Sequence, residues 1–202
     1  MEFKIFAKDY IKNLTNLLNS IDLDEYEKFF NTILSIENDS TIYVLGNGGS
    51  SAAASHMVND LAIGLKIRDI KTINAISLSD NSAINFAIAN DIGFENVFYM
   101  QLKGILKPND IIIAISCSGN SLNIIKAIKY AKEIGSKIVG LTGFDGGDLK
   151  RLSDIKIHFQ TQKGEYGLVE DAHSIVNHLL VDYFKKGNLW INSLAKIHIF
   201  IM

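Results

Sequence analysis

The chain has 202 residues, of which 48% are apolar, and a formal net charge of −2 at pH 7. This length suits one α/β domain with a substantial core, and the apolar content excludes disorder over most of the chain. A charge this close to zero, without a basic block, argues against nucleic acid as the main partner.

The single cysteine, Cys117, excludes an internal disulfide and suits a reducing compartment. The first residues carry charges and lack the apolar segment of a signal peptide. No uninterrupted apolar run approaches the ~18 residues of a membrane span. We therefore expect a cytoplasmic protein with no membrane partner.

The first 37 residues form a helical preface to the rest of the chain. Apolar residues from Phe3 to Leu18 recur at helical spacing, and a second helix is predicted to end near Ile36. The segment 20–24 between them offers a break and a new N-cap. Two interpretations stay open: this preface is an oligomer contact, or it packs across the core.

From residue 41 onward, predicted strands and helices alternate. The predicted strands are 41–46, 71–76, 110–115, 137–142 and 155–159. The predicted helices are 51–65, 80–90, 94–106, 121–134, 147–152 and 169–186. This alternation indicates an α/β fold with a parallel sheet between two layers of helices. We expect one domain over residues 1–186, with its α/β core at 38–186.

The segment 187–202 lies beyond this domain and is hard to interpret. Gly187 and Asn188 are expected to end the last helix, yet Leu189-Trp190-Ile191 and residues 197–201 are strongly apolar. A docked strand, an oligomer contact and a poorly ordered end all remain open for this tail.

Two turns rich in glycine and serine follow the first and third predicted strands. The first reads Gly46-Asn47-Gly48-Gly49-Ser50-Ser51, and the second reads Ser116-Cys117-Ser118-Gly119-Asn120-Ser121. Each turn leads into a helix, whose first N–H groups and dipole favour an anion. Ligands of such sheets bind beyond the carboxyl ends of the strands. The pair of turns therefore predicts a phosphate site.

Two better-known phosphate motifs fit the first turn poorly. A dinucleotide fingerprint requires a third glycine where Ser51 stands, and an acidic residue ending the second strand, where 72–76 has none. A Walker-type loop requires Gly-Lys-Ser/Thr, which is absent. A nucleotide site is therefore disfavoured.

Five separated motifs resemble the sugar isomerase (SIS) domain, and more narrowly the phosphoheptose isomerases. They are Gly46-Asn47-Gly48-Gly49-Ser50, His56, Ala89-Asn90-Asp91, Ile115 to Ser121, and Gly140-Leu141-Thr142-Gly143. The resemblance covers about residues 1–186 and implies an SIS-type three-layer sandwich. It also implies isomerisation of sedoheptulose 7-phosphate to D-glycero-D-manno-heptose 7-phosphate, a heptose precursor for surface polysaccharide such as lipopolysaccharide or capsule.

By this resemblance, the serines of both turns bind the phosphate of a small phosphorylated sugar. These residues are Ser50, Ser116, Ser118 and Ser121, with Cys117 among them. The residues expected to line the sugar are Asn47, Gly48, Gly49, Asn90, Asp91 and Glu170. The family's sites are completed by neighbouring subunits, which implies a homotetramer here.

Histidines and acids on two helices are the candidate metal ligands and proton carriers. His56 and Asp60 are four residues apart, so they share one helix face. Metal-binding members of the family add a glutamine and a histidine on the last helix, which matches Glu170 and His178. The implied ligands of a divalent ion, most plausibly zinc, are therefore His56, Asp60, Glu170 and His178.

This chain departs from the family at two of these positions. It carries Asp60 where the family has glutamate, and Glu170 where the family has glutamine. Asp171, seven residues before His178, is an alternative to Glu170, since seven residues are close to two helical turns.

An aldose–ketose isomerase removes a proton beside a carbonyl and returns it to the neighbouring carbon. His178 is our preferred base, since histidine ordinarily titrates near neutrality, and Asp60 is the alternative. A different class also remains, a non-catalytic SIS module that binds a sugar phosphate or a partner protein. The joint presence of His56, Asp60 and His178 favours the enzyme.

Overall fold

We describe a computed structural model of the chain, which covers residues 2–199, with side-chain surroundings described as far as residue 186. Its centre is a five-stranded sheet in the order β2-β1-β3-β4-β5. Every neighbouring pair of strands is parallel. The strands are β1 (Thr41–Gly46), β2 (Asn74–Ser77), β3 (Ile111–Ser116), β4 (Lys137–Thr142) and β5 (Ile155–His158). The predicted α/β class with one parallel sheet is confirmed.

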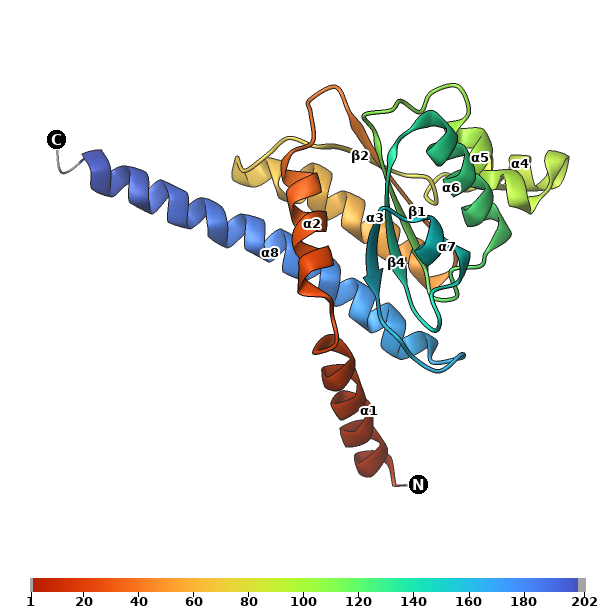
Figure 1. Ribbon diagram of the computed structural model, residues 1–202, viewed down its shortest axis with the longest axis horizontal. Coiled ribbons are helices and arrows are strands. Elements are labelled where there is room, and N and C mark those ends of the chain that lie inside the picture. Colours follow the sequence, from red (N-terminus) through yellow and green to blue (C-terminus); the bar gives the residue numbers. More distant parts are fainter. Residues whose placement is uncertain (1, 200–202) are drawn as a thin grey trace.

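Helices cover both faces of this sheet (Figure 1). The first face carries α2 (Leu23–Leu34), α3 (Gly49–Val58) and the buried part of α8 (Tyr166–Ile199). The second face carries α5 (Val97–Leu102), α6 (Leu122–Ile134) and α7 (Gly147–Leu152). The remaining helical segments are α1 (Phe3–Leu18), η1 (Asn59–Gly64), η2 (Lys66–Arg68), α4 (Ser82–Ile92) and η3 (Phe94–Asn96).

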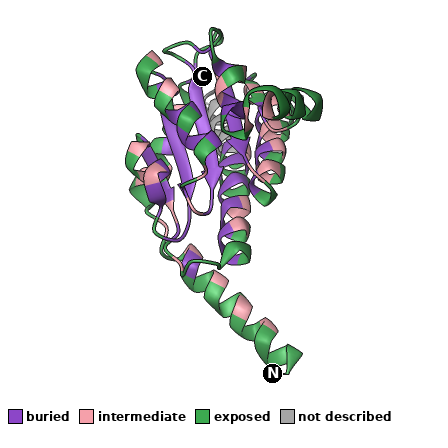
Figure 2. Ribbon diagram, turned by 90° about the vertical axis from the view of Figure 1, so that its right-hand side faces the viewer, coloured by how far each residue is buried: buried purple, intermediate pink, exposed green. Residues whose placement is uncertain are grey.

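The alternation of side chains along each strand explains the two layers. In β1, Ile42 and Val44 are fully buried against the first set of helices, whereas Tyr43 and Leu45 pack into the second. Both faces are therefore apolar, which is typical of a parallel sheet enclosed by helices. The three central strands, β1, β3 and β4, are almost entirely buried (Figure 2).

The helical preface consists of two helices with different surroundings. Asp22 caps α2 by accepting hydrogen bonds from the backbone N–H groups of Asp24 and Glu25, as the predicted break required. Phe29 and Ile33 of α2 are fully buried against the sheet. By contrast, Leu17 is the one buried residue of α1, which projects from the body (Figures 1 and 2).

The last helix differs from its prediction at both ends. It begins at Tyr166 instead of 169, and it continues through Gly187 and Asn188 to Ile199. A glycine inside a helix costs only about 1 kcal/mol relative to alanine, which good helix formers on either side can offset. A docked strand is therefore wrong for 187–199, whereas the domain boundary at 186 stays a prediction and residues 200–202 lie outside the described residues.

Other boundaries shift by a few residues. The helix predicted at 51–65 begins at Gly49 and changes to a π-helix at Asn59. The segment predicted as one helix at 94–106 is a 3₁₀ turn followed by the short helix α5. No helix within residues 2–199 is both long and apolar enough to cross a membrane.

Candidate active site

The two glycine- and serine-rich turns lie side by side at one edge of the sheet. Strands β1 and β3 are neighbours, and Gly46 is level with Ile115 in their register. Because both strands run in the same direction, the loops that follow them leave at the same edge. The strand order places this edge at a topological switch point, where open α/β sheets bind ligands.

Two consecutive glycines bring the first loop close to α8. Gly48 caps α3 with φ of +55°, a conformation that side chains with a Cβ rarely adopt. A Cβ on Gly49 would lie 2.5 Å from Oε1 of Glu170. The loop therefore lies against the carboxylate of α8, and any larger residue at position 49 would displace that group.

A cavity of about 160 Å³ lies between the two loops. Its lining includes all four predicted phosphate-binding serines, Ser50, Ser116, Ser118 and Ser121. Asn47, Cys117 and Glu170 also line it. Among the described residues around this cavity there is no lysine or arginine, so an anion would depend on neutral donors.

The serine hydroxyls are arranged so that they can donate to a ligand. Ser116 Oγ accepts a hydrogen bond of 3.1 Å from the N–H of Gly119, and Ser118 Oγ accepts one of 3.3 Å from the N–H of Asn120. A hydroxyl that accepts from the backbone still has its own O–H to donate. These contacts hold the oxygens in place and leave the protons for a phosphate.

Cys117 is a neutral part of this lining. Burial raises the pKa of its thiol to about 11, and the nearby Glu170 carboxylate acts in the same direction. The thiolate is the nucleophilic form of cysteine. Cys117 therefore stays protonated near neutral pH and is not a nucleophile.

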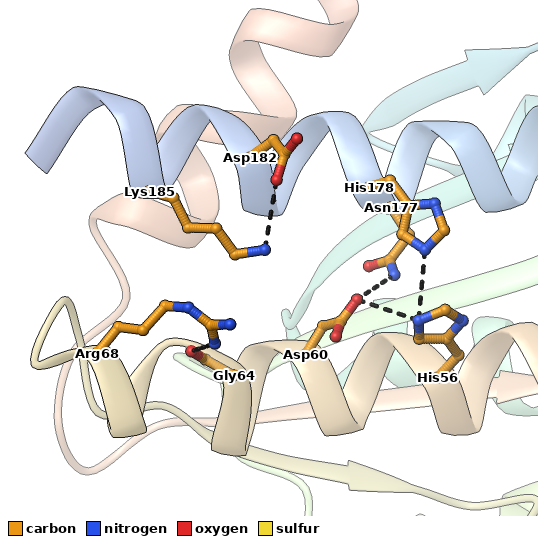
Figure 3. Close-up of polar contacts among 8 residues, drawn as sticks. All are labelled: His56, Asp60, Gly64, Arg68, Asn177, His178, Asp182 and Lys185. Atoms are coloured by element: carbon orange, nitrogen blue, oxygen red, sulfur yellow. Dashed lines mark hydrogen bonds and ion pairs between the residues drawn. The ribbon is translucent and has the colours of Figure 1, made fainter. Parts of the chain in front are cut away.

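A second group of polar side chains lies between α3, η1 and α8 (Figure 3). His56 Nε2 lies 3.3 Å from Asp60 Oδ2 and 3.4 Å from His178 Nε2. The buried side chain of Asn177 donates a hydrogen bond of 2.9 Å to the same Asp60 oxygen. The structure thus brings together three of the four predicted metal ligands, although 122 residues separate His56 from His178.

Asp60 belongs to the π-helix η1, where the N–H of Leu65 donates to the carbonyl of Asp60 at 3.1 Å. Short π-helical turns inside α-helices occur frequently at functional sites. In this chain the π-helical turn contains Asp60, which is one methylene group shorter than the family's glutamate. Its carboxylate nevertheless lies 3.3 Å from His56 Nε2. The missing methylene group does not separate the predicted partners.

The donor set fits a tetrahedral divalent ion. One atom each from His56, Asp60 and His178 lies within 4.8 Å of the others. Zinc binds nitrogen and oxygen at about 2.0–2.2 Å, which places tetrahedral ligands about 3.3–3.6 Å apart. The separations of His56 Nε2 from Asp60 Oδ2 and from His178 Nε2, 3.3 and 3.4 Å, agree with that spacing.

A second cavity, of about 290 Å³, lies beside the phosphate cavity and reaches His56 of this cluster. His56 lines it on one side, and Ser50 and Glu170 line both cavities. The two cavities are therefore adjacent, and we refer to them, together with the His/Asp/His group beside them, as the crevice. Glu170 lies between them but is not part of the group formed by His56, Asp60 and His178.

The structure separates the roles of Glu170 and Asp171. Tyr10 of α1 donates a hydrogen bond of 2.6 Å to Asp171 Oδ2, and this contact raises the pKa of Tyr10 to about 12. Asp171 thus has a partner outside the crevice, although it lines the edge of the larger cavity. Both acids line the larger cavity, but of the two only Glu170 also lines the phosphate cavity.

Asn90 and Asp91, predicted to line the sugar, lie elsewhere in this chain. They are exposed near the end of α4, where Asn90 donates a hydrogen bond of 2.9 Å to Asp91. Neither residue lines either half of the crevice. Within one chain, the structure therefore does not bring them to the crevice.

Two buried asparagines at the site were missed by the sequence analysis. Asn177 supports Asp60, and Asn123 of α6 contacts Asn47 of the first loop. Asn177 stands beside the predicted base, and Asn123 follows the last serine of the second turn by two residues. An asparagine near a motif is too common to single out without knowing what it contacts.

The family model for the SIS domain matches residues 9–143. Phosphoheptose isomerase from Helicobacter pylori (strain HPAG1) is 37% identical over 154 residues, which is 76% of this chain and 79% of the relative. Phosphoheptose isomerase from Leptospira biflexa (strain Patoc 1 / Ames) is 39% identical over 75% of this chain and 77% of its own. The solved phosphoheptose isomerase from Neisseria gonorrhoeae aligns with a TM-score of 0.79 and 26% identity, covering 91% of this chain and 97% of that one.

Proposed function

The chain belongs to the SIS domain family, together with the phosphoheptose isomerases, and on this premise we propose that it isomerises sedoheptulose 7-phosphate to D-glycero-D-manno-heptose 7-phosphate. One observation carries this proposal: four serines line one cavity, and the adjacent cavity is lined by His56 of a His/Asp/His group. The reaction needs an anchor for the phosphate and an acid–base group near the carbonyl, and the crevice offers both.

Phosphate binding is assigned to Ser50, Ser116, Ser118 and Ser121, with Asn47 beside them. These contacts lie far from the reacting carbons, so their binding energy serves to hold the carbonyl end in position. Glycines 48 and 49 allow the chain to approach the sugar closely. The hydroxyl groups of the sugar then lie toward Glu170 and the His/Asp/His group.

Proton transfer is assigned to His178 and Asp60. One such group removes the proton beside the carbonyl and returns it to the adjacent carbon. His178 is the preferred carrier, because histidine as a residue type ordinarily titrates near neutrality and this side chain is exposed. Asp60 is held by His56 and Asn177, which orient one carboxylate oxygen.

A divalent cation, zinc by its donor set, would be held by His56, Asp60 and His178. Such an ion supplies Lewis-acid polarisation of a carbonyl or hydroxyl oxygen. A cation on Nε2 of His178 would occupy the lone pair that otherwise accepts the proton. We therefore assign the proton to His178 in the free site, whereas in a loaded site only the carboxylate oxygen of Asp60 that does not bind the cation could accept it, with Glu170 as an added ligand or sugar contact.

A homotetramer is proposed from the surface of α4. None of its eleven residues is buried, although it carries Ile84, Phe86 and Ile92, and Phe86 is 74% exposed. Contact with another subunit would cover these side chains and bring Asn90 and Asp91 to a neighbouring site. A cytoplasmic location is proposed from the lone buried thiol of Cys117 and from the phosphorylated substrate.

The alternative, an SIS module that binds a sugar phosphate or a protein without turnover, is disfavoured by the convergence of His56, Asp60 and His178. The test is proton NMR of a panel of phosphorylated ketoses incubated with the zinc-loaded protein. Appearance of the heptose aldose from sedoheptulose 7-phosphate is expected. Binding of that ketose with no aldose from any member of the panel would support the module instead.

A further inference from the structure

Asn123 is a buried side chain that connects the two loops of the crevice. It lies in the first turn of α6 and is 1% exposed. Its Nδ2 donates a hydrogen bond of 2.9 Å to Asn47 Oδ1, and Asn47 Nδ2 donates one of 3.0 Å back to Asn123 Oδ1. Two amides thus form a closed pair between the loop after β1 and the helix that follows the loop after β3.

A backbone contact determines the positions of the oxygen and nitrogen atoms in the side-chain amides of Asn123 and Asn47. The N–H of Ile124 donates a hydrogen bond of 3.0 Å to Asn123 Oδ1. A backbone N–H can only donate, so the atom that receives it must be the carbonyl oxygen. The Nδ2 of Asn123 must then face Asn47 Oδ1, which in turn places Asn47 Nδ2 against Asn123. The orientation of Asn47 therefore follows from one backbone group on α6.

This orientation matters because Asn47 lines the phosphate cavity. An asparagine amide has two N–H groups, and the pair with Asn123 uses one of them. The second N–H of Asn47 has no partner among the described residues. It is therefore available to a ligand oxygen in a cavity whose described lining has no cationic side chain.

We propose that Asn123 is a positioning residue for phosphate binding: it holds the amide of Asn47 so that one N–H donates to the phosphate, and it sets the spacing between the two loops. The proposal rests on the proposed function, since it assumes that the ligand is a phosphate ester. Neutral donors bind an anion well only when they are already oriented, because reorienting them on binding costs affinity.

The test compares Asn123→Leu with Asp110→Asn. Leucine has a similar size but removes both bonds to Asn47. Asp110 is also buried and also joins β1 to β3, by accepting 2.8 Å bonds from the N–H groups of Thr41 and Lys107, but at the opposite end of these strands. Asp110→Asn is thus a matched control for loss of a buried polar contact.

Inorganic phosphate is the probe, measured by calorimetry, with KM and kcat measured in parallel. Asn123→Leu is expected to raise the Kd for phosphate and KM by about tenfold, the effect of losing one hydrogen bond to a charged group. Asp110→Asn is expected to lower the melting temperature with Kd unchanged. Unchanged Kd in folded Asn123→Leu, or an equal rise in Asp110→Asn, would overturn the proposal.

A double-mutant cycle with Asn47→Ala shows whether Asn123 acts through Asn47. The double variant is expected to bind phosphate no more weakly than Asn47→Ala alone, whereas additive losses would contradict the proposed route. If Asn123→Leu does not fold, the wild-type protein still gives an answer by NMR. Phosphate should shift one side-chain amide proton of Asn47, and a titration that shifts neither proton of Asn47 would overturn the proposal.

These readouts separate this inference from the proposed function. Phosphate binding that depends on Asn123, in a protein that isomerises no phosphoketose, would support the positioning role and remove the isomerase. Isomerisation of a phosphoketose, with phosphate binding that does not depend on Asn123, would support the isomerase and remove the positioning role.

Discussion

The two halves of the crevice are built in different ways. The phosphate half consists of two short loops, each continuous in sequence, that the neighbouring strands β1 and β3 bring to one edge. The acid–base half draws His56 and Asp60 from one helical segment and His178 from another, more than a hundred residues later. The first depends mainly on local backbone geometry, and the second depends on how α8 packs against α3 and η1.

This difference implies that the two halves fail separately when mutated. Variants in the loops should change affinity for the phosphate, whereas variants between α3 and α8 should change proton transfer, metal binding or stability. Four predictions test this separation.

The largest effect is expected from His178→Gln. Removing a proton carrier costs about 10²–10⁴-fold in rate, so we expect kcat and solvent-deuterium exchange beside the carbonyl to fall by about 10³-fold in metal-free protein. The Kd for inorganic phosphate should remain that of the wild type. Asp60→Asn is the companion variant, measured in the same metal-free state. A larger loss of deuterium exchange in Asp60→Asn than in His178→Gln would contradict the assignment to His178 and make Asp60 the proton carrier in the metal-free protein.

The protein is expected to lose stability at acid pH because of a buried histidine on α8, the helix that also carries His178. His173 of α8 is completely buried, both its ring nitrogens lack partners among the described residues, and burial lowers its pKa to about 4. Its ordinary pKa is 6.5, so the unfolded chain takes up a proton before the folded one does. Stability should fall as pH drops from about 6.5 to 4, by about 3 kcal/mol in total.

His173→Leu provides the comparison, because leucine does not titrate and leaves no unpartnered nitrogen. The difference in unfolding free energy between wild type and variant, measured with urea at several pH values, should change by about 3 kcal/mol over this range. Burial also lowers the pKa of His158, which adds its own pH dependence to the unfolding free energy. Because His158 is present in both proteins, this part cancels in the difference between them. A difference that is independent of pH would contradict the assignment.

The double variant Ser116→Ala/Ser118→Ala is expected to raise KM by up to about 100-fold, from the loss of two hydrogen bonds to a charged group. The loss should appear mainly in KM, because contacts to the phosphate are shared by the ground and transition states. Steady-state kinetics measure both constants. A fall in kcat with KM unchanged would show that the two loops belong to the catalytic half instead.

The smallest effect is expected from Glu170→Gln, which acts where the halves meet. The carboxylate lines both cavities and would repel a phosphate anion in the absence of a cation. Removing this charge should tighten inorganic phosphate binding by a few-fold in metal-free protein, a modest gain for a half-buried site. Calorimetry with and without zinc checks this, and weaker binding in metal-free Glu170→Gln would show that the carboxylate supports the phosphate site.

The sequence predicts the loop half of the site better than the helical half, for physical reasons. Ser116, Ser118 and Ser121 follow a strand within six residues, so the turn that holds them also places them together. In the helical half, the partner of Asp171 is Tyr10, a contact across 161 residues that the sequence around Asp171 does not show. The partners of Asn123 and Asn177 depend on packing between helices in the same way.

The fold shows the same distinction between local and long-range information. The alternation of predicted strands with predicted helices indicated the parallel sheet and its five strands, and the buried central strands β1, β3 and β4 are mostly apolar, as such strands require. The continuation of α8 past Gly187 was missed, because glycine is a frequent helix end and the sequence alone does not show when its cost is offset. The change to π-helix at Asn59 has no local signal that we can identify.

The most direct test of one crevice acting on one phosphosugar compares sedoheptulose 7-phosphate with unphosphorylated sedoheptulose. Both are incubated with the zinc-loaded protein in deuterated water, and the aldose and its deuterium content are measured by NMR. We predict conversion of the phosphate ester with deuterium at the carbon beside the carbonyl, and kcat/KM for the unphosphorylated sugar lower by at least about 10³-fold, because remote binding energy is lost. Equal kcat/KM for the two sugars, or no exchange with either, would contradict the account.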